Sequence, residues 1–164
     1  IGGFLVSGAV SKPERPRRLL NRHLYLAAAV ILAVSGTAYA FNSRQSKIAV
    51  KLNELERLDA VQDWYSAEEK AEEILKLGPA NPEMRSGVLW TLAKAEALSG
   101  KFDEAVQHAR ALKLIDPQNG SYMLGLLYYD MKEFELSRQE LMAAQKAGAK
   151  HEQIDKLLEE LNKK

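Results

Sequence analysis

The sequence predicts an all-α protein in which a solenoid of about three helical hairpins and a capping helix follows a single transmembrane helix. Two observations support this fold class. From Ser46 onward, apolar residues recur at spacings of three and four, which is typical of helices that bury one face. Before that region, residues 24–41 contain no charged side chain. We therefore divide the chain into a basic N-terminal segment (residues 1–23), a transmembrane helix (24–41) and a helical domain (47–164).

Charge is distributed unevenly along the 164 residues of the chain. Residues 1–46 hold six Lys and Arg against one Glu, whereas residues 47–164 hold 17 Lys and Arg against 21 Asp and Glu. The helical domain is therefore mildly acidic, which argues against nucleic acid as a partner because phosphate binding needs a basic face. Cysteine is absent, so disulfides, thiolate metal sites and cysteine nucleophiles are excluded.

The uncharged segment from Leu24 to Phe41 is 18 residues long. As a helix it would cover about 27 Å, close to the hydrocarbon thickness of a bilayer. Lys and Arg concentrate on its N-terminal side, so the positive-inside rule places the N-terminus in the cytoplasm. The helical domain is then extracytoplasmic, and periplasmic if the protein is bacterial. Residues 1–11 are apolar but too short to span a bilayer alone, and they are either the end of an earlier membrane helix or a disordered arm.

Small residues recur every four positions in this segment and would let another membrane helix approach closely. The set is Ala29, Ala33, Gly36, Thr37 and Ala40. The alternative is that such spacings arise by chance in an Ala-rich span. A further alternative is a signal peptide cleaved after Ala38-Tyr39-Ala40, which would leave Phe41 as the mature N-terminus. The apolar run is longer than that of a usual signal peptide, so we expect an uncleaved anchor.

The clearest hairpin runs from Leu89 to Pro117. Two apolar helical patterns flank Gly100, where the first helix can end in a left-handed turn. The small residues Ala93, Ala105 and Ala109 suit two antiparallel helices that approach closely. The order L-x-x-L-A, G-K-F-D-E-A and D-P resembles a tetratricopeptide repeat, a helix-turn-helix of about 34 residues. The resemblance implies a right-handed solenoid of such hairpins.

A hairpin with the same order precedes this one, at about residues 47–79. Trp64 stands where the clearest hairpin has Phe102, but Gln62 stands where the turn glycine is expected. Between these two hairpins, Asn81 is predicted as an N-cap with Pro82 at the first helical position. The following helix carries Glu96 where the family pattern has a large residue. Either Glu96 is a partly buried acid with a partner, or the helix is slightly rotated.

The third hairpin, residues 121–149, matches the family pattern L-G-x-x-Y with Leu124, Gly125 and Tyr128. A glycine inside a helix costs about 1 kcal/mol, so Gly125 indicates a close contact with another helix. Residues 151–164 place four apolar side chains on one helical face, which predicts a helix that covers the exposed end of the solenoid.

Nothing in the sequence indicates catalysis, a metal site or a cofactor. His23, His108 and His151 lie in separate elements without a second ligand at metal spacing, and they are expected to be solvated or interfacial. No phosphate-binding glycine loop, nucleophile elbow or zinc motif is present. We expect a protein that is not an enzyme.

The resemblance implies that the first helix of each hairpin lines a groove that binds a partner polypeptide. The residues placed there are Leu52, Glu56, Trp90, Lys94, Asn119, Tyr122, Leu126 and Tyr129. The alternative for Trp90 and Tyr129 is a place in the core. The basic clamp with which some family members hold a C-terminal carboxylate is absent, because Leu52, Glu56 and Met123 occupy its positions.

These patterns predict a membrane-anchored adaptor that binds another protein outside the cytoplasm, in assembly or export of a membrane or envelope complex. Its partners would be complex subunits or an extended peptide segment, and lipid along residues 24–41. A structural accessory subunit of a large membrane complex and a signal-cleaved soluble periplasmic adaptor are the two alternatives.

Overall fold

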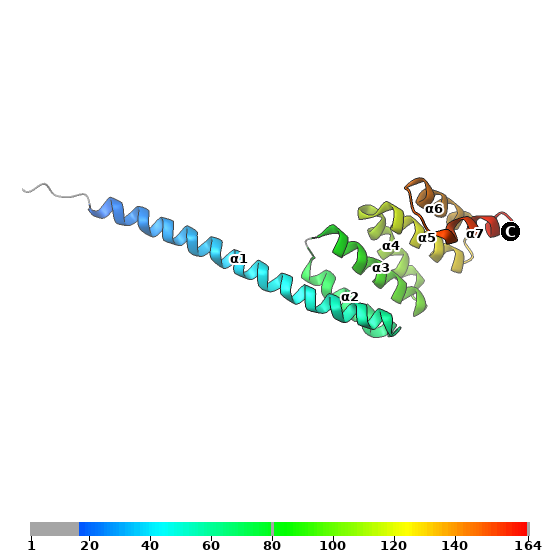
Figure 1. Cartoon of the computed structure of the whole chain (residues 1–164), viewed down its shortest axis with the longest axis horizontal. Helices are drawn as coiled ribbons and strands as arrows, with labels where there is room; N and C mark the ends of the chain where they lie inside the picture. Colours follow the sequence, from blue (N-terminus) through cyan, green and yellow to red (C-terminus); the bar gives the residue numbers. More distant parts are fainter. Residues whose placement is uncertain (1–16, 80, 164) are drawn as a thin grey trace, which may run out of the picture. The chain divides into compact units, whose positions relative to one another are not determined.

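The computed structural model describes residues 17–79 and 81–163, with side chains from Ala29 onward, and these residues form seven helices (Figure 1). The chain divides into two compact units, Ile1–Asn42 and Ser43–Lys164. The helices are α1 (Arg17–Ala60), α2 (Trp64–Leu77), α3 (Pro82–Leu98), α4 (Phe102–Ile115), α5 (Pro117–Asp130), α6 (Phe134–Lys146) and α7 (Glu152–Leu161). Residues 1–16, which make up most of the basic N-terminal segment, lie outside the described residues.

Helix α1 includes residues of both units. Residues 42–46 are polar but contain neither Gly nor Pro, so nothing in them ends the helix. Every described side chain of the first unit, from Ala29 to Asn42, is exposed. Within the described residues we find no helical stretch that is both long enough and apolar enough to cross a bilayer. The side chains of residues 24–28, where the predicted span begins, lie outside that search.

The second unit consists of three hairpins that follow the same local geometry. At each turn one residue has a positive φ: Gln62 at 60°, Gly100 at 79° and Lys132 at 64°. A backbone hydrogen bond closes each turn: Asp63 N to Leu58 O at 3.1 Å, Lys101 N to Glu96 O at 2.8 Å and Glu133 N to Tyr128 O at 2.8 Å. The predicted hairpins are therefore confirmed, including the first one, where Gln62 adopts the conformation expected of glycine.

Side-chain caps set the starts of three helices. Asn81 accepts a hydrogen bond from Glu83 N at 2.8 Å and is followed by Pro82, as predicted. Asp63 accepts from Ser66 N at 3.2 Å at the start of α2. Asp116 ends α4 and also caps α5, since its Oδ1 accepts from Asn119 N at 3.1 Å. The Asp116-Pro117 pair, which closes the clearest hairpin in the sequence, thus joins that hairpin to the third one with no intervening loop.

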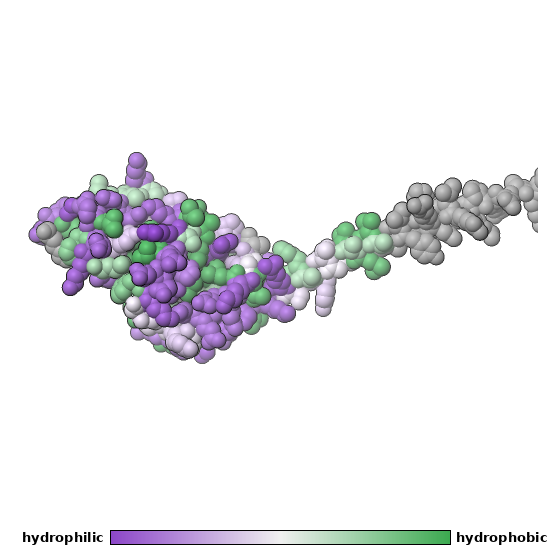
Figure 2. All heavy atoms as spheres, turned by 180° about the vertical axis from the view of Figure 1, so that it is seen from behind, coloured by the Kyte–Doolittle hydropathy of each residue, from purple (hydrophilic) through white to green (hydrophobic). Residues whose placement is uncertain are grey.

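Three hydrophobic clusters, each built from three successive helices, fill the interior. Leu92 belongs to the cluster of α1, α2 and α3, Leu112 to that of α3, α4 and α5, and Leu141 to that of α5, α6 and α7; each is fully buried. On the face shown in Figure 2, hydrophilic side chains cover most of the helical domain, with smaller hydrophobic areas between them. Because neighbouring clusters share a helix, the core runs continuously from the first hairpin to α7.

Two glycines let helices approach closely. A Cβ added at Gly125 would lie 2.7 Å from the Leu141 side chain, and the Gly125 carbonyl accepts a hydrogen bond from Ser137 Oγ at 2.8 Å. The close contact predicted at Gly125 is confirmed. A Cβ at Gly120 would lie only 2.2 Å from Lys113 Cα, so α5 touches the backbone of α4 there. This contact at Gly120 was not predicted from the sequence.

The last helix, α7, packs its predicted apolar face against the third hairpin. Ile154 is 2% exposed and Leu161 is fully buried, while Leu157 and Leu158 are partly buried in the same cluster. A helix is thus found where the sequence predicts one, and its apolar face covers the third hairpin.

Candidate functional site

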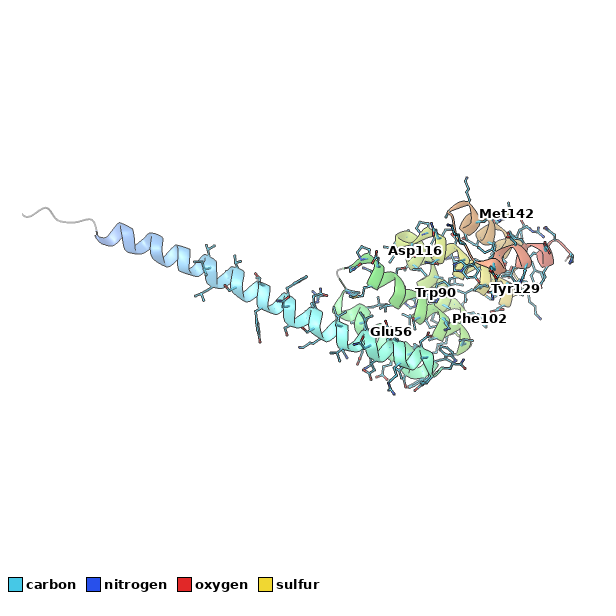
Figure 3. The ribbon with its side chains drawn as sticks, in the orientation of Figure 1. Glu56, Trp90, Phe102, Asp116, Tyr129 and Met142 are labelled. Carbon is cyan, nitrogen blue, oxygen red and sulfur yellow. The ribbon has the colours of Figure 1, made fainter. Side chains whose placement is uncertain are left out.

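The residues predicted to line a groove lie on three helices: Leu52 on α1, Trp90 and Lys94 on α3, and Asn119, Tyr122, Leu126 and Tyr129 on α5. Figure 3 marks Trp90 and Tyr129 together with Glu56 of α1. The structure separates this set into two parts. The α5 residues lie on the side of α7, whereas Leu52 and Trp90 line an open hollow and Lys94 pairs with Asp59.

Helix α7 covers the predicted groove residues of α5. Tyr122 is only 5% exposed, its ring stacks on His151 with centroids 4.0 Å apart, and its hydroxyl donates to Gln153 Oε1 at 2.7 Å. Tyr129 donates to Glu160 Oε2 at 2.9 Å, and Leu126 packs in the cluster that contains Ile154. In this structure Tyr122 is therefore buried beside α7 and does not line an open groove. A capping helix must cover the last hairpin, and that covering falls on this face of α5.

Asn119 and Trp90 extend these contacts on either side of Tyr122. Asn119 Nδ2 donates to Asp116 Oδ2 at 2.7 Å, and its Oδ1 lies 3.2 Å from His151 Nε2. The Trp90 ring stacks on Tyr122 with centroids 6.1 Å apart and planes inclined by 14°. Trp90 is only partly buried, so it belongs to the core and also adjoins the hollow beside α3.

The open hollow, which we call the α1–α3 trough, has a volume of about 510 Å³. Its lining comes from the second half of α1 and the first half of α3: Leu52, Leu55, Glu56, Asp59, Asn81, Glu83, Met84, Gly87, Val88, Trp90 and Thr91. Its volume lies within the range of about 300–1,000 Å³ typical of small-ligand pockets. Partner side chains could therefore enter it.

Lys94, which is not among the lining residues, makes contacts within the domain. Its ammonium pairs with Asp59 Oδ1 at 2.9 Å and lies 4.8 Å from the centroid of the Trp64 ring. These contacts link α3 to α1 and to α2. Lys94 therefore holds the trough in shape, and its charge is already matched by Asp59.

Gly87 and the carboxylates of Glu56 and Glu83 are among the lining residues of the trough. Of these three residues, only Glu56 was predicted from the sequence. Gly87 is exposed in the middle of α3, and an added Cβ would have no atom within 4 Å. Glu56 and Glu83 are exposed and have no ion pair or side-chain hydrogen bond to any described residue. A glycine between Pro82 and Leu98, away from either helix end, was the sequence signal that could have pointed to this site.

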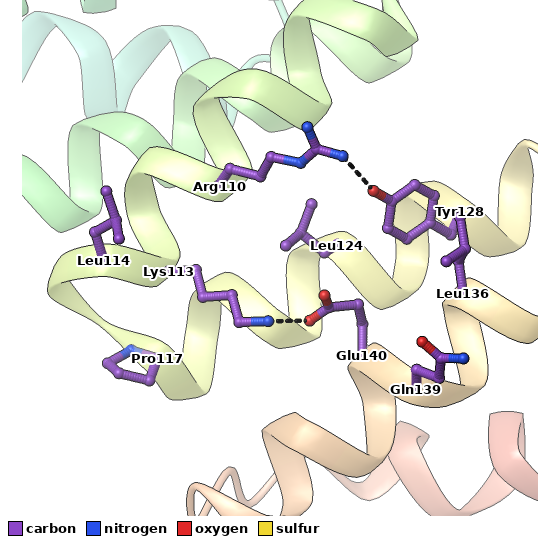
Figure 4. A pocket seen from close by; sticks show the side chains of 9 residues that line it. All are labelled: Arg110, Lys113, Leu114, Pro117, Leu124, Tyr128, Leu136, Gln139 and Glu140. Atoms are coloured by element: carbon purple, nitrogen blue, oxygen red, sulfur yellow. Dashed lines mark hydrogen bonds and ion pairs between the residues drawn. The ribbon is translucent and has the colours of Figure 1, made fainter.

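A second hollow of about 670 Å³ lies between α4, α5 and α6 (Figure 4). Arg110 donates to the Tyr128 hydroxyl at 3.0 Å, and Lys113 pairs with Glu140 at 2.6 Å. Figure 4 shows Leu124 between these two polar links. The links join α4 to α5 and α4 to α6, so the charged groups at this hollow mainly hold the second and third hairpins together.

Glu96 is buried and has a partner, which settles the choice left open by the sequence. It is 2% exposed, and its Oε2 lies 2.8 Å from His108 Nδ1 across the second hairpin. His108 is therefore an interfacial histidine that satisfies a buried carboxylate. The hydrogen bond to Glu96 raises the pKa of His108 above its usual value of 6.5, although burial lowers it. The negative charges of Glu72 and Glu104 also raise this pKa.

We expect the unfolding free energy of the domain to decrease as the pH rises above about 6.5. Because the pKa of His108 is higher in the folded state, the stabilisation is complete below the unfolded pKa and is lost as the pH passes through the folded pKa. Urea unfolding from about pH 6 to about pH 9 should show this decrease. In the His108→Gln variant this decrease with pH should be smaller. An equal decrease in the variant and the unchanged protein would show that His108 is not its cause.

Within residues 17–79 and 81–163, no cluster of three or more His, Cys, Asp or Glu is placed to hold a metal ion. The lining residues of the trough include carboxylates and the hydroxyl of Thr91, but no histidine.

The repeated turns, shared caps and continuous core define a tetratricopeptide-like helical solenoid. The structure is similar to the P58(IPK) TPR domain, with a TM-score of 0.64 and 19% identity over 76% of this chain. The chain spans 35% of that structure's length. It is also similar to the Sgt2 TPR domain from Aspergillus fumigatus, with a TM-score of 0.62 and 21% identity, covering 71% of this chain and 78% of that one. No protein-family model matches the sequence, and neither does any curated protein.

Proposed function

We propose that the chain is an adaptor that binds a segment of another protein in the α1–α3 trough. The observation that carries this proposal is an open hollow with apolar walls, formed by Leu52, Met84 and Trp90, that none of the described helices fills. Partly exposed aromatic and apolar side chains in a hollow are typical anchors of protein interfaces. The tetratricopeptide-like fold fits this role, since helical solenoids offer extended surfaces to partners.

The proposal includes attachment to a membrane through residues 24–41, with the helical domain outside the cytoplasm. In the described part of this segment, apolar side chains such as Ile31, Leu32 and Tyr39 are 64%, 72% and 79% exposed. These exposed apolar side chains would be covered by lipid or by another membrane helix. The adaptor would then act in assembly or export of an envelope complex, with the small residues of this segment facing a neighbouring helix.

Site-specific photo-crosslinking in intact membranes tests the trough. A photoreactive residue at Thr91, inside the trough, should crosslink to a partner protein, whereas one at the exposed Glu69 of α2 should not. Crosslinks from both positions, or from neither, would contradict binding in the trough. A fixed ratio of partner to chain after purification would indicate an accessory subunit, while a substoichiometric ratio would indicate an assembly factor.

Extraction of membranes with alkaline carbonate tests the anchor separately. An anchored chain stays in the pellet, and protease added outside the cytoplasm should remove the helical domain. Release into the supernatant with Phe41 as the N-terminal residue would favour the signal-cleaved adaptor.

A further inference from the structure

Gly87 has no structural task within the domain. It lies inside α3 with a helical backbone, so it is not needed for a turn, and no side chain or backbone atom of another helix approaches it. Gly120 and Gly125, in contrast, are each required by a close contact with the neighbouring helix. Glycine weakens a helix interior, and it suits positions where another backbone comes close. The floor of the α1–α3 trough is therefore open down to the backbone of α3.

The walls of the trough offer side chains but few free backbone groups. Both walls are helical, and at the start of α3 the Asn81 side chain and carbonyl accept from the N–H groups of Glu83 and Arg85. An extended segment in the trough would leave its own N–H and C=O groups without backbone partners there. A helix satisfies its backbone internally, so it fits this surface better.

The rim of the trough is negatively charged. Asp59 is neutralised by Lys94, but Glu56 and Glu83 face solvent on opposite walls with no cation paired to them among the described residues. A partner with carboxylates at these two positions would be repelled, and one with Lys or Arg would be attracted. Charge complementarity thus selects a cationic occupant.

We infer that the occupant of the trough is an amphipathic helix of a partner protein, with an apolar stripe against Gly87, Met84 and Trp90 and Lys or Arg beside Glu56 and Glu83. This inference rests on the proposed function and adds the chemistry of the partner. The apolar stripe enters the hollow, and the cations at its edges reach the two carboxylates. The absence of a side chain at Gly87 sets how closely the two helices approach.

Two synthetic helical peptides test this chemistry on the full chain, purified in a neutral maltoside. Both have Leu at helical spacing over about five turns. One has Lys on its polar face and the other has Glu. We expect the Lys peptide to bind at least about tenfold more tightly, because both unpaired carboxylates attract it and repel the other peptide. Tryptophan fluorescence measures the binding, since Trp90 lines the trough.

Variants decide whether the peptide sits in the trough. Gly87→Leu should weaken binding of the Lys peptide by about tenfold or more, because the new side chain occupies the floor of the trough, where an added Cβ meets no neighbouring helix. Glu56→Gln with Glu83→Gln should remove most of the preference for Lys over Glu. The matched control, Glu69→Gln with Glu159→Gln, makes the same change in net charge at exposed positions on α2 and α7 and should preserve the preference.

Equal binding of the two peptides, or unchanged binding by Gly87→Leu, would overturn the inference. A loss of preference in the control pair as large as in the trough pair would also overturn it, because the attraction would then be non-specific. A different result would contradict the proposed function itself, namely the absence of crosslinks from Thr91. If Thr91 crosslinks to a partner segment that is extended or acidic, the adaptor role stands and the basic-helix inference is wrong.

Discussion

Gly120→Ala is expected to destabilise the helical domain by roughly 3 kcal/mol, the upper end of the usual range for overpacking. The added Cβ would lie 2.2 Å from Lys113 Cα and 2.3 Å from Lys113 N. Both are backbone atoms, so no side-chain rotation relieves the clash, and α4 and α5 must move apart. Alanine favours a helix over glycine by about 1 kcal/mol, but separating the two helices loosens the cluster around Leu112 and costs more. Urea unfolding followed by circular dichroism measures the change.

Gly87→Ala is the matched control, because it makes the same substitution in the middle of α3. With no atom within 4 Å of the added Cβ, only the helix propensity changes, and we expect a stabilisation of about 0.5–1 kcal/mol. Opposite signs for the two variants would confirm the distinct roles of the two glycines. A destabilisation at Gly87 would show that this position is closed.

The hairpins could be predicted from the sequence because their signals are local. The Asn81-Pro82 and Asp116-Pro117 starts each depend on two adjacent residues. Even the turn at Gln62, which lacks the expected glycine, could be placed because the apolar pattern on both sides fixed its position. One non-glycine residue at positive φ is a modest strain that the packing of the flanking helices outweighs.

Contacts between distant parts of the chain were harder to predict. Gly87 and Gly120 are both interior helix glycines, yet one faces an open hollow and the other a neighbouring backbone. Their local sequence signals are alike, and only the position of α4 distinguishes them. The pairing of Glu96 with His108 likewise depends on how α3 and α4 face each other.

The extent of the predicted groove also depends on contacts between distant parts of the chain. The resemblance to a repeat family assigns a face to each first helix, but it does not state how much of that face the capping helix covers. Here α7 covers Tyr122 and contacts Leu126 and Tyr129, while the face of Leu52 and Trp90 stays partly accessible. The accessible site is therefore nearer the start of the domain than the sequence indicated.

Replacing Ile154 and Leu161 together by Ala is expected to detach α7 while the three hairpins stay folded. Truncation of a buried Ile or Leu typically costs about 2–5 kcal/mol, and these two are the most buried side chains of α7. The remaining attachments of α7 are the partly buried Leu157 and Leu158 and polar links such as Arg138 Nη2 to Leu161 O at 2.7 Å and Gln145 Nε2 to Asp155 Oδ1 at 2.9 Å. Such bonds contribute about 1 kcal/mol each, too little to hold the helix alone.

Native-state hydrogen exchange measures this detachment. Amide protection should be lost in α7 and kept in α3 and α4, because a terminal element of a solenoid can open without breaking the internal interfaces. Lys156→Ala with Glu159→Ala, on the exposed face of α7, is the control and should leave protection unchanged. An equal loss of protection in α3 would mean that the domain unfolds only as a whole. If α7 alone opens, Tyr122 becomes accessible, and the proposed binding surface would then extend from the α1–α3 trough along α5.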